Sequence, residues 1–378
     1  VDQGISVFIV SWKSADASLA DVIWDDYIAA QIEAVDVVRD LLSVPSVHSI
    51  GYCVAGTTLA ATLAILAAKG EADKVRSATF FTAQVDFEKA GDLLNFIDDA
   101  HISAIEALAK DGVMDGRYLA ATFNLLRGND LIWSTVSKNY LMGEGYPAFD
   151  LLHWNGDVTN LPAKWHLSYL CDLYRDNKLS HSGALSALGV PIDLTKVTTP
   201  SFIQAGREDH IAPAQSVWKM HDLFTGPITF LLAGSGHIAG VVNPPSAQKY
   251  QYWTNDAPVA SLDDFIAGAS ETKGSWWPDW LEWLKSLDAT TVKAAGARIP
   301  GKPLSAQRHV IAALQLFGLA LAVVAIARPV ERTSERTRSE GRILVLFDVS
   351  LSMEATDVPP NRLESAKDAA RIVIRETS

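Results

Sequence analysis

Three separated segments carry side chains that together could perform nucleophilic catalysis. Cys53 lies in GYCVAGT (51–57), between a short β-type run at 46–52 and a strongly apolar helical run. Asp209 and His237 each follow a further predicted strand. A nucleophile, then an acid, then a histidine is the chain order of a catalytic triad in one large group of sheet-based hydrolytic folds. The pattern therefore predicts a Cys-His-Asp triad that works through a covalent thioester.

The turn that carries Cys53 is predicted to be tight. A strand that turns sharply into a helix strains the nucleophile's backbone and admits only small residues two positions before and after it, here Gly51 and Ala55. The following helix N-terminus is expected to stabilise a thiolate and a developing oxyanion, with the backbone N–H of Val54 as oxyanion donor. The competing interpretation, a buried inert core thiol, is disfavoured by this context.

The acid and base candidates follow the predicted strands 200–205 and 227–232. Asp209 is expected to accept the Nδ1–H of an imidazole and to fix its tautomer. Glu208 is the rival acid and is expected to be solvated. His237 ends the segment GSGH, whose glycines are expected to let the loop project the imidazole toward Cys53. Because catalytic groups collect at the carboxyl ends of parallel strands, we expect these side chains to meet.

The elements that must position these residues alternate between strand and helix, which predicts a mostly parallel, doubly wound sheet of the α/β-hydrolase type. Residues 86–195 interrupt the alternation, are mostly helical without a clear strand, and are predicted to form a cap or lid. The core would then comprise residues 1–85 and 196–300. Strands are expected at 4–12, 46–52, 75–82, 200–205 and 227–232, and helices at 21–43, 56–69, 213–223 and 276–287.

Composition restricts the function classes further. The formal net charge of −12 argues against a nucleic-acid partner. The two cysteines suggest no disulfide framework and fit a reducing compartment. The chain opens directly on a predicted strand without a signal peptide. We therefore expect an N-terminal truncation, with a preceding core strand and the loop that supplies the second oxyanion donor outside this sequence.

Five segments, in order, resemble the polyhydroxyalkanoate synthase family, class I in type. The resemblance covers about residues 1–300, and one departure is Ala55, where the family's box has a second glycine. The segments are GYCVAGT (51–57), HWNGDVTNLP (153–162), GREDHIAP (206–213), GSGHIAGVVNPP (234–245) and GSWWPDW (274–280).

This resemblance implies an acyltransferase that polymerises (R)-3-hydroxyacyl-CoA into a polyester, releases CoA and needs no cofactor. It implies that Cys53 carries the growing chain and that His237 is the base. Asp209 would either orient His237 or assist the 3-hydroxyl step, with His210 as an accessory. Partners implied are the polyester chain, the surface of a cytoplasmic granule and a second copy in a homodimer. Trp154 and Asp157 would hold the cap.

The last segment has a different character. Residues 310–327 form an apolar run followed by an arginine-rich linker, which predicts a transmembrane helix within 301–342 and an inner-membrane tether; a buried core helix is the alternative. Residues 343–378 begin with a strand-like run and D-x-S-x-S, and resemble the start of a von Willebrand factor A domain. That resemblance implies an incomplete Mg²⁺ site at Asp348, Ser350 and Ser352. A natural fusion and a joined reading frame both remain open.

Two other functions compete with polymer synthesis. A Cys-dependent thioesterase or depolymerase on the same fold would release free acid, although the cap segment 153–162 and the Trp-rich segment 274–280 argue against it. An inactive, membrane-tethered fusion fragment would fold without releasing CoA.

Overall fold

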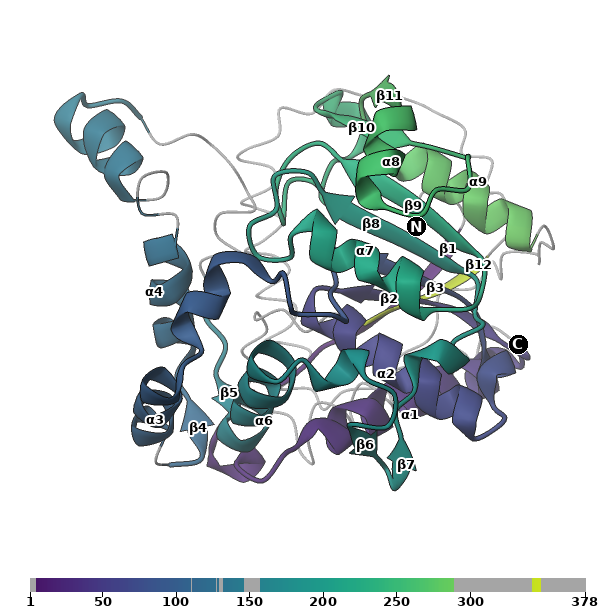
Figure 1. The fold of residues 1–378 in the computed structure, drawn as a ribbon, viewed down its shortest axis with the longest axis horizontal. Coiled ribbons are helices and arrows are strands. Elements are labelled where there is room, and N and C mark those ends of the chain that lie inside the picture. Colours follow the sequence, from purple (N-terminus) through teal and green to yellow (C-terminus); the bar gives the residue numbers. More distant parts are fainter. Residues whose placement is uncertain are drawn as a thin grey trace, which may run out of the picture.

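The computed structural model describes residues 5–109, 111–126, 128, 132–145, 157–288 and, for the backbone alone, 342–347. Its centre is a mixed eight-stranded sheet in the order β1-β12-β2-β3-β8-β9-β10-β11 (Figure 1). The strands from β1 to β9 pair in parallel, and β10 and β11 add an antiparallel edge. The predicted mostly parallel α/β fold is confirmed. The strands are β1 Ile5–Val10, β2 Val47–Tyr52, β3 Val75–Phe81, β8 Ser201–Gly206, β9 Ile228–Ala233, β10 Gln251–Thr254, β11 Ser270–Lys273 and β12 Arg342–Phe347.

Helices cover both faces of this sheet. Neighbouring residues of a strand point to opposite faces, so Phe80 packs into one apolar cluster and Phe81 into another. The Phe80 cluster includes side chains of α1, α2, α7 and α8, whereas the Phe81 cluster includes three buried side chains of the closing Trp-rich segment. The core helices are α1 Trp24–Leu42, α2 Val54–Ala68, α7 Ala214–Leu223, α8 Leu262–Gly268 and α9 Trp277–Leu287.

The helix α2 is the most deeply buried of these helices. Every residue from Ala55 to Leu66 is buried, which fits a sequence that is apolar on all sides. Its position beneath β2 and β3 fixes where the turn before it, and therefore Cys53, can lie.

The strand β12 lies second from one edge of the sheet, between β1 and β2. The sequence predicted this strand as the opening of a separate C-terminal fragment. In the structure it pairs in parallel with β1 on one side and with β2 on the other, with Leu344 opposite both Val7 and His48, and the assignment of 343–378 to a separate fragment stays a prediction. The strands β1 and β2, which α1 connects, are therefore not neighbours in the sheet. The strand β12, almost 300 residues after β2 in the chain, lies between them.

The later part of the insertion predicted at 86–195 packs against α1 and α2, and its earlier part extends away from the sheet (Figure 1). It is mostly helical as predicted, but it also holds two short antiparallel strand pairs, so the expectation of no clear strand was wrong. Two-residue strands carry no sequence periodicity. Its elements include α3 Asp99–Leu108, β4 Val113–Met114, α4 Gly116–Leu126, β5 Leu161–Pro162, α6 Ala163–Ser168, the π-helix η6 Tyr169–Arg175, β6 Ser186–Ala187 and β7 Val190–Pro191.

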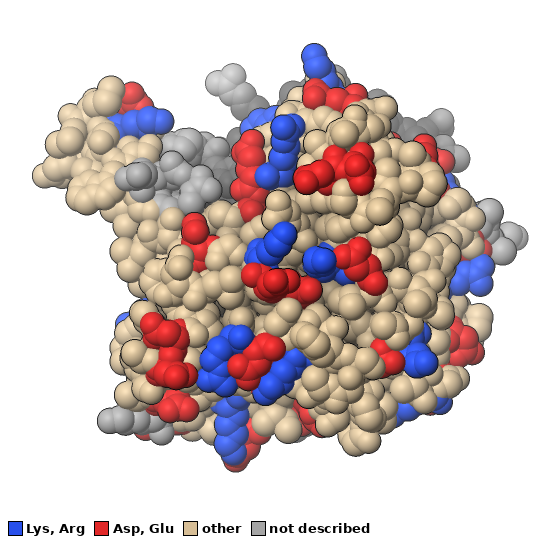
Figure 2. Space-filling model, viewed as in Figure 1, with Lys and Arg blue, Asp and Glu red and all other residues tan. Residues whose placement is uncertain are grey.

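The surface shows no segregation of charge on the face drawn in Figure 2, where acidic and basic side chains alternate over the core. The outer part of the insertion is different, because large apolar side chains are exposed there: Leu125, Trp133, Tyr140, Leu141 and Met142. Among the described residues, no helix has the length and apolar character needed to cross a bilayer. The apolar run 310–327 lies outside those residues.

Candidate active site

Cys53 occupies a strained turn between β2 and α2. Its φ of 53° and ψ of −127° are a conformation that side-chain-bearing residues rarely adopt. The turn is close-packed, because a Cβ added to Gly51 would lie 2.4 Å from the Cα of Gly56. The backbone N–H of Cys53 donates to the carbonyl of Phe81 at 2.9 Å, which fastens the turn to the neighbouring strand. The predicted tight turn is therefore present, and Cys53 is half-buried at its apex.

Val54 is the first residue of α2. The first N–H groups of a helix have no partner within the helix and point toward the N-terminus, where the helix dipole is positive. The backbone N–H of Val54 thus lies next to Cys53, at the place where an oxyanion formed by attack of the sulfur would need a donor.

Asp209 and His237 form a buried hydrogen-bonded pair. The Nδ1 of His237 lies 2.7 Å from Oδ2 of Asp209. The other carboxylate oxygen of Asp209 accepts backbone N–H groups from Ile211 at 2.8 Å and Ala212 at 2.9 Å. Both oxygens of Asp209 are therefore engaged, and they hold the imidazole in one orientation. Glu208, the rival acid, is exposed.

The electrostatics of the pair favour a protonated imidazole. Burial lowers the pKa of His237, but the charges of Cys53 and Asp209 and hydrogen bonds to both raise it overall, to about 10. His237 is also hydrogen-bonded to Cys53, so all three predicted triad residues interact. This arrangement places beside the sulfur a base that can accept the thiol proton.

Two cap tyrosines complete the surroundings of Cys53. Burial raises the pKa of both Tyr169 and Tyr174 well above its ordinary value, and the charge of Cys53 adds to the shift. Their rings pack on Phe87, with centroids 6.0 and 4.7 Å away. Both tyrosines are therefore close enough to Cys53 for its charge to act on them, and with Phe87 they form an aromatic cluster in the insertion.

The histidine loop departs from expectation in one respect. Its glycines were expected to supply conformational freedom, but Ser235 is the residue with positive φ, at 110°. Gly234 is needed for close approach instead, because a Cβ there would lie 2.7 Å from the carbonyl oxygen of Gln251. The neighbouring strand β10, which the sequence analysis missed, therefore sets the size limit in this loop.

The remaining predicted residues lie next to Asp209 in the chain, on the surface of the insertion or outside the described residues. His210 is half-buried in the acid loop, and its accessory role stays a prediction. Asp157 is exposed at the start of the described part of its segment. Trp154 and the three predicted Mg²⁺ ligands, Asp348, Ser350 and Ser352, lie outside the described residues. Within the described ranges, no group of three or more His, Cys, Asp or Glu could hold a metal ion.

Asn160 joins the cap to the core, a role that the sequence did not reveal. Its backbone N–H donates to the Oγ of Ser14 at 3.0 Å, and its carbonyl accepts from the N–H of Ala15 at 3.0 Å. Its side-chain oxygen accepts from Gly116 N–H, at the start of α4. The cap segment of the sequence is thus anchored by Asn160 directly after β1.

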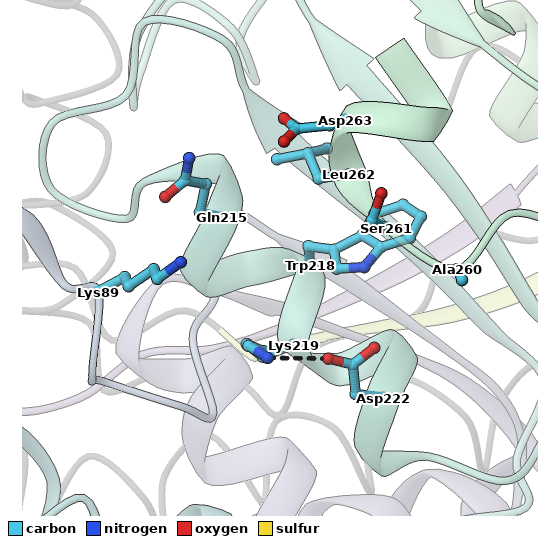
Figure 3. Close-up of a pocket in the computed structure, with 9 residues that line it drawn as sticks. All are labelled: Lys89, Gln215, Trp218, Lys219, Asp222, Ala260, Ser261, Leu262 and Asp263. Carbon is cyan, nitrogen blue, oxygen red and sulfur yellow. Dashed lines mark hydrogen bonds and ion pairs between the residues drawn. The ribbon is translucent and has the colours of Figure 1, made fainter. Parts of the chain in front are cut away.

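A separate surface pocket of about 190 Å³ lies beside α7 and α8 (Figure 3). The Nζ of Lys219 and Oδ2 of Asp222 pair there at 3.0 Å, next to the indole of Trp218. Cys53, Asp209 and His237 do not line it. Because its ion pair is internally satisfied, we assign this pocket no part in the chemistry.

Replacing Gly51 by alanine is expected to destabilise the fold by roughly 1–3 kcal/mol, because overpacking against backbone cannot be relieved by a side-chain rotation. The added Cβ would meet the Cα of Gly56 at 2.4 Å. Urea unfolding followed by circular dichroism measures the change. The matched control is Gly128→Ala, where no atom of the described residues lies within 4 Å of the added Cβ. Equal stability of the two variants would contradict the close packing of the turn.

Residues 11–244, which include all three triad positions, match the family model of the alpha/beta hydrolase fold. The chain therefore belongs to the α/β-hydrolase fold family. More particularly, it is homologous to poly(3-hydroxyalkanoate) polymerases, as the resemblance of its motifs predicted.

Three relatives illustrate the extent of this similarity. The chain is 46% identical over 307 residues to the poly(3-hydroxyalkanoate) polymerase subunit PhaC of Rhizobium meliloti, covering 81% of this chain and 49% of the relative. It is 45% identical over 291 residues to the corresponding subunit of Cupriavidus necator, covering 75% and 49%. It is 46% identical over 304 residues to the polymerase of Methylorubrum extorquens, covering 80% and 49%. The chain spans about half the length of the curated relatives it matches.

Proposed function

We propose that this chain is the catalytic part of an acyltransferase that joins (R)-3-hydroxyacyl units from CoA thioesters into a polyester and releases CoA. The observation that carries the proposal is the buried Asp209–His237 pair beside Cys53 at the strained turn. The similarity to named poly(3-hydroxyalkanoate) polymerases supplies the substrate class.

In the first step, the Cys53 thiolate attacks the thioester carbonyl of the hydroxyacyl-CoA. A bond forms between the carbonyl carbon and Sγ, the bond to the CoA sulfur breaks, and the leaving thiolate takes the proton held on His237. The backbone N–H of Val54 stabilises the oxyanion of the tetrahedral intermediate. Exchange between two thioesters is nearly balanced in energy, which suits a cysteine nucleophile better than a serine.

In the second step, the 3-hydroxyl of another hydroxyacyl-CoA attacks the Cys53 thioester. His237 accepts the hydroxyl proton, an ester bond forms, and the Cys53 thiolate is restored. The lengthened chain then carries the CoA group and returns to Cys53 by repeating the first step. The engagement of both Asp209 oxygens supports orientation of His237 as the role of that carboxylate, rather than direct assistance to the hydroxyl. Neither step needs a cofactor.

Exclusion of water decides between polymer and free acid, because water would hydrolyse the acyl-enzyme. The aromatic cluster of Tyr169, Tyr174 and Phe87, whose two tyrosines feel the charge of Cys53, supports a site from which water is excluded. The proposal favours polymer synthesis over the thioesterase or depolymerase alternative for this reason.

The partners follow from the same proposal. The product chain would place the protein at the surface of a cytoplasmic polyester granule. The exposed apolar side chains of the insertion, among them Trp133 and Tyr140, support a homodimer, since large exposed apolar patches are typical of interaction surfaces. The acidic net charge of −12 supports the absence of a nucleic-acid partner.

Product size tests the proposal. Incubation with (R)-3-hydroxybutyryl-CoA should release CoA and give material of high molecular mass on size-exclusion chromatography. CoA release accompanied only by 3-hydroxybutyric acid would establish the thioesterase alternative. A folded protein that releases no CoA would favour the inactive fusion fragment.

A further inference from the structure

The loop that carries His237 has little regular structure of its own, but aromatic side chains hold its backbone. The Oη of Tyr52 donates to the carbonyl of His237 itself, at 3.2 Å. The indole N–H of Trp276 donates to the carbonyl of Gly240 at 2.8 Å, and that of Trp277 to the carbonyl of Val241 at 3.1 Å. Three donors from two distant segments thus meet one short stretch of chain.

The Trp276–Trp277 pair also contacts the strand next to the nucleophile. The two indoles stack on each other with centroids 4.5 Å apart, and both pack edge-on against Phe81, at 5.3 and 5.4 Å. The carbonyl of Phe81 accepts the backbone N–H of Cys53. One aromatic cluster therefore contacts both the strand that fastens the Cys53 turn and the loop that holds the imidazole.

We infer that Trp276 and Trp277 are positioning residues for His237, and that their indole N–H groups set the distance between the imidazole and Cys53. The inference rests on the proposed triad but not on polymer chemistry. Trp276 is 1% exposed, so its hydrogen bond is protected from competition by water. A displacement of a catalytic group by about 1 Å can lower the rate roughly 100-fold. Loss of an indole donor that holds the loop can therefore lower the rate even though the indole does not touch the reacting atoms.

The chain offers a matched control for this inference. Trp280 lies on the same helix, is 2% exposed and also packs on Phe81, but its indole N–H donates to Oγ1 of Thr79 on β3. Trp276→Phe and Trp280→Phe thus remove the same kind of buried donor from neighbouring turns. Only Trp276→Phe frees a carbonyl of the histidine loop.

The test is the rate at which iodoacetamide alkylates Cys53 as a function of pH, in the full chain carrying Cys171→Ser. His237→Ala gives the reference profile for a sulfur without its base. We expect Trp276→Phe to lower the rate at neutral pH by roughly 10-fold and to shift the profile toward that of His237→Ala. Trp280→Phe should lose comparable free energy of unfolding in urea but keep the profile of the parent.

Each outcome has one meaning. Identical profiles for Trp276→Phe and Trp280→Phe would show that the pair has a structural role alone and overturn the inference. A parental profile for His237→Ala would instead overturn the proposed triad. If Trp276→Phe does not fold, the half-buried Trp277→Phe removes the second donor and must show the same shift for the inference to stand.

Discussion

Replacing Cys53 by alanine should reduce CoA release from (R)-3-hydroxybutyryl-CoA to the background rate, a loss on the order of 10⁶-fold. The turn between β2 and α2 presents one sulfur beside the His237–Asp209 pair. Alanine has a Cβ as cysteine does, so the substitution adds no strain to the backbone of the turn and the fold should persist. Loss of the sulfur removes the only group that can form the thioester in the proposed mechanism. Stopped incubations followed by intact-mass spectrometry should show an acyl adduct on the parent and none on the variant.

Cys171→Ala is the matched control, because it removes the other cysteine of the chain. Cys171 lies in η6 of the cap and is half-buried, and burial raises the pKa of its thiol. This variant should keep both CoA release and the adduct. An adduct on Cys171, or CoA release by Cys53→Ala at more than a trace of the parental rate, would show that Cys53 is not the nucleophile.

The local chemistry of the site could be predicted from the sequence because short-range rules determine it. A sharp turn from strand to helix demands small neighbours, and Gly51 and Ala55 satisfy that demand within five positions. The meeting of Asp209 with His237 follows from a longer-range rule, since parallel strands direct their carboxyl ends to one edge. Both hydrogen-bonded residues lie directly after adjacent strands, β8 and β9.

The supports of the site could not be predicted in the same way. The donors from Tyr52, Trp276 and Trp277 act on backbone carbonyls, which leave no sequence pattern. A tryptophan that packs in the core and one that also donates to a loop look the same in sequence. Asn160 anchors the cap through contacts with residues nearly 150 positions away, and only tertiary structure brings them together.

The pairing of strands was the least predictable feature of the fold. The run 343–349 was predicted as a strand because it is rich in β-formers, and β12 spans Arg342–Phe347. Periodicity identifies a strand but does not say which edge it will join, so its place between β1 and β2 could not be read from the chain. The strands β10 and β11 were missed because each has four residues, too few to show alternation.

Asp209→Asn should lower the rate of CoA release by roughly 10³–10⁴-fold, because an amide can donate to Nδ1 and hold the imidazole in the wrong tautomer. In the parent, Oδ2 of Asp209 accepts from that nitrogen at 2.7 Å. Glu208→Gln is the matched control: it removes a carboxylate one position away that is exposed to solvent. Steady-state rates of the two variants decide the question. Equal losses in both would mean that the net charge of the loop matters, and not the orientation of His237.

The same substitution should change how stability depends on pH. The pKa of His237 is raised from 6.5 to about 10 in the fold. A raised pKa contributes stability that is complete below about pH 6.5 and is lost as the pH rises toward 10. The charge and hydrogen bond of Asp209 are among the causes of the increase, so their removal should shift this loss to lower pH. The free energy of unfolding in urea should therefore fall less between about pH 7 and about pH 9 in Asp209→Asn than in the parent. An unchanged difference would show that Asp209 does not stabilise the imidazolium.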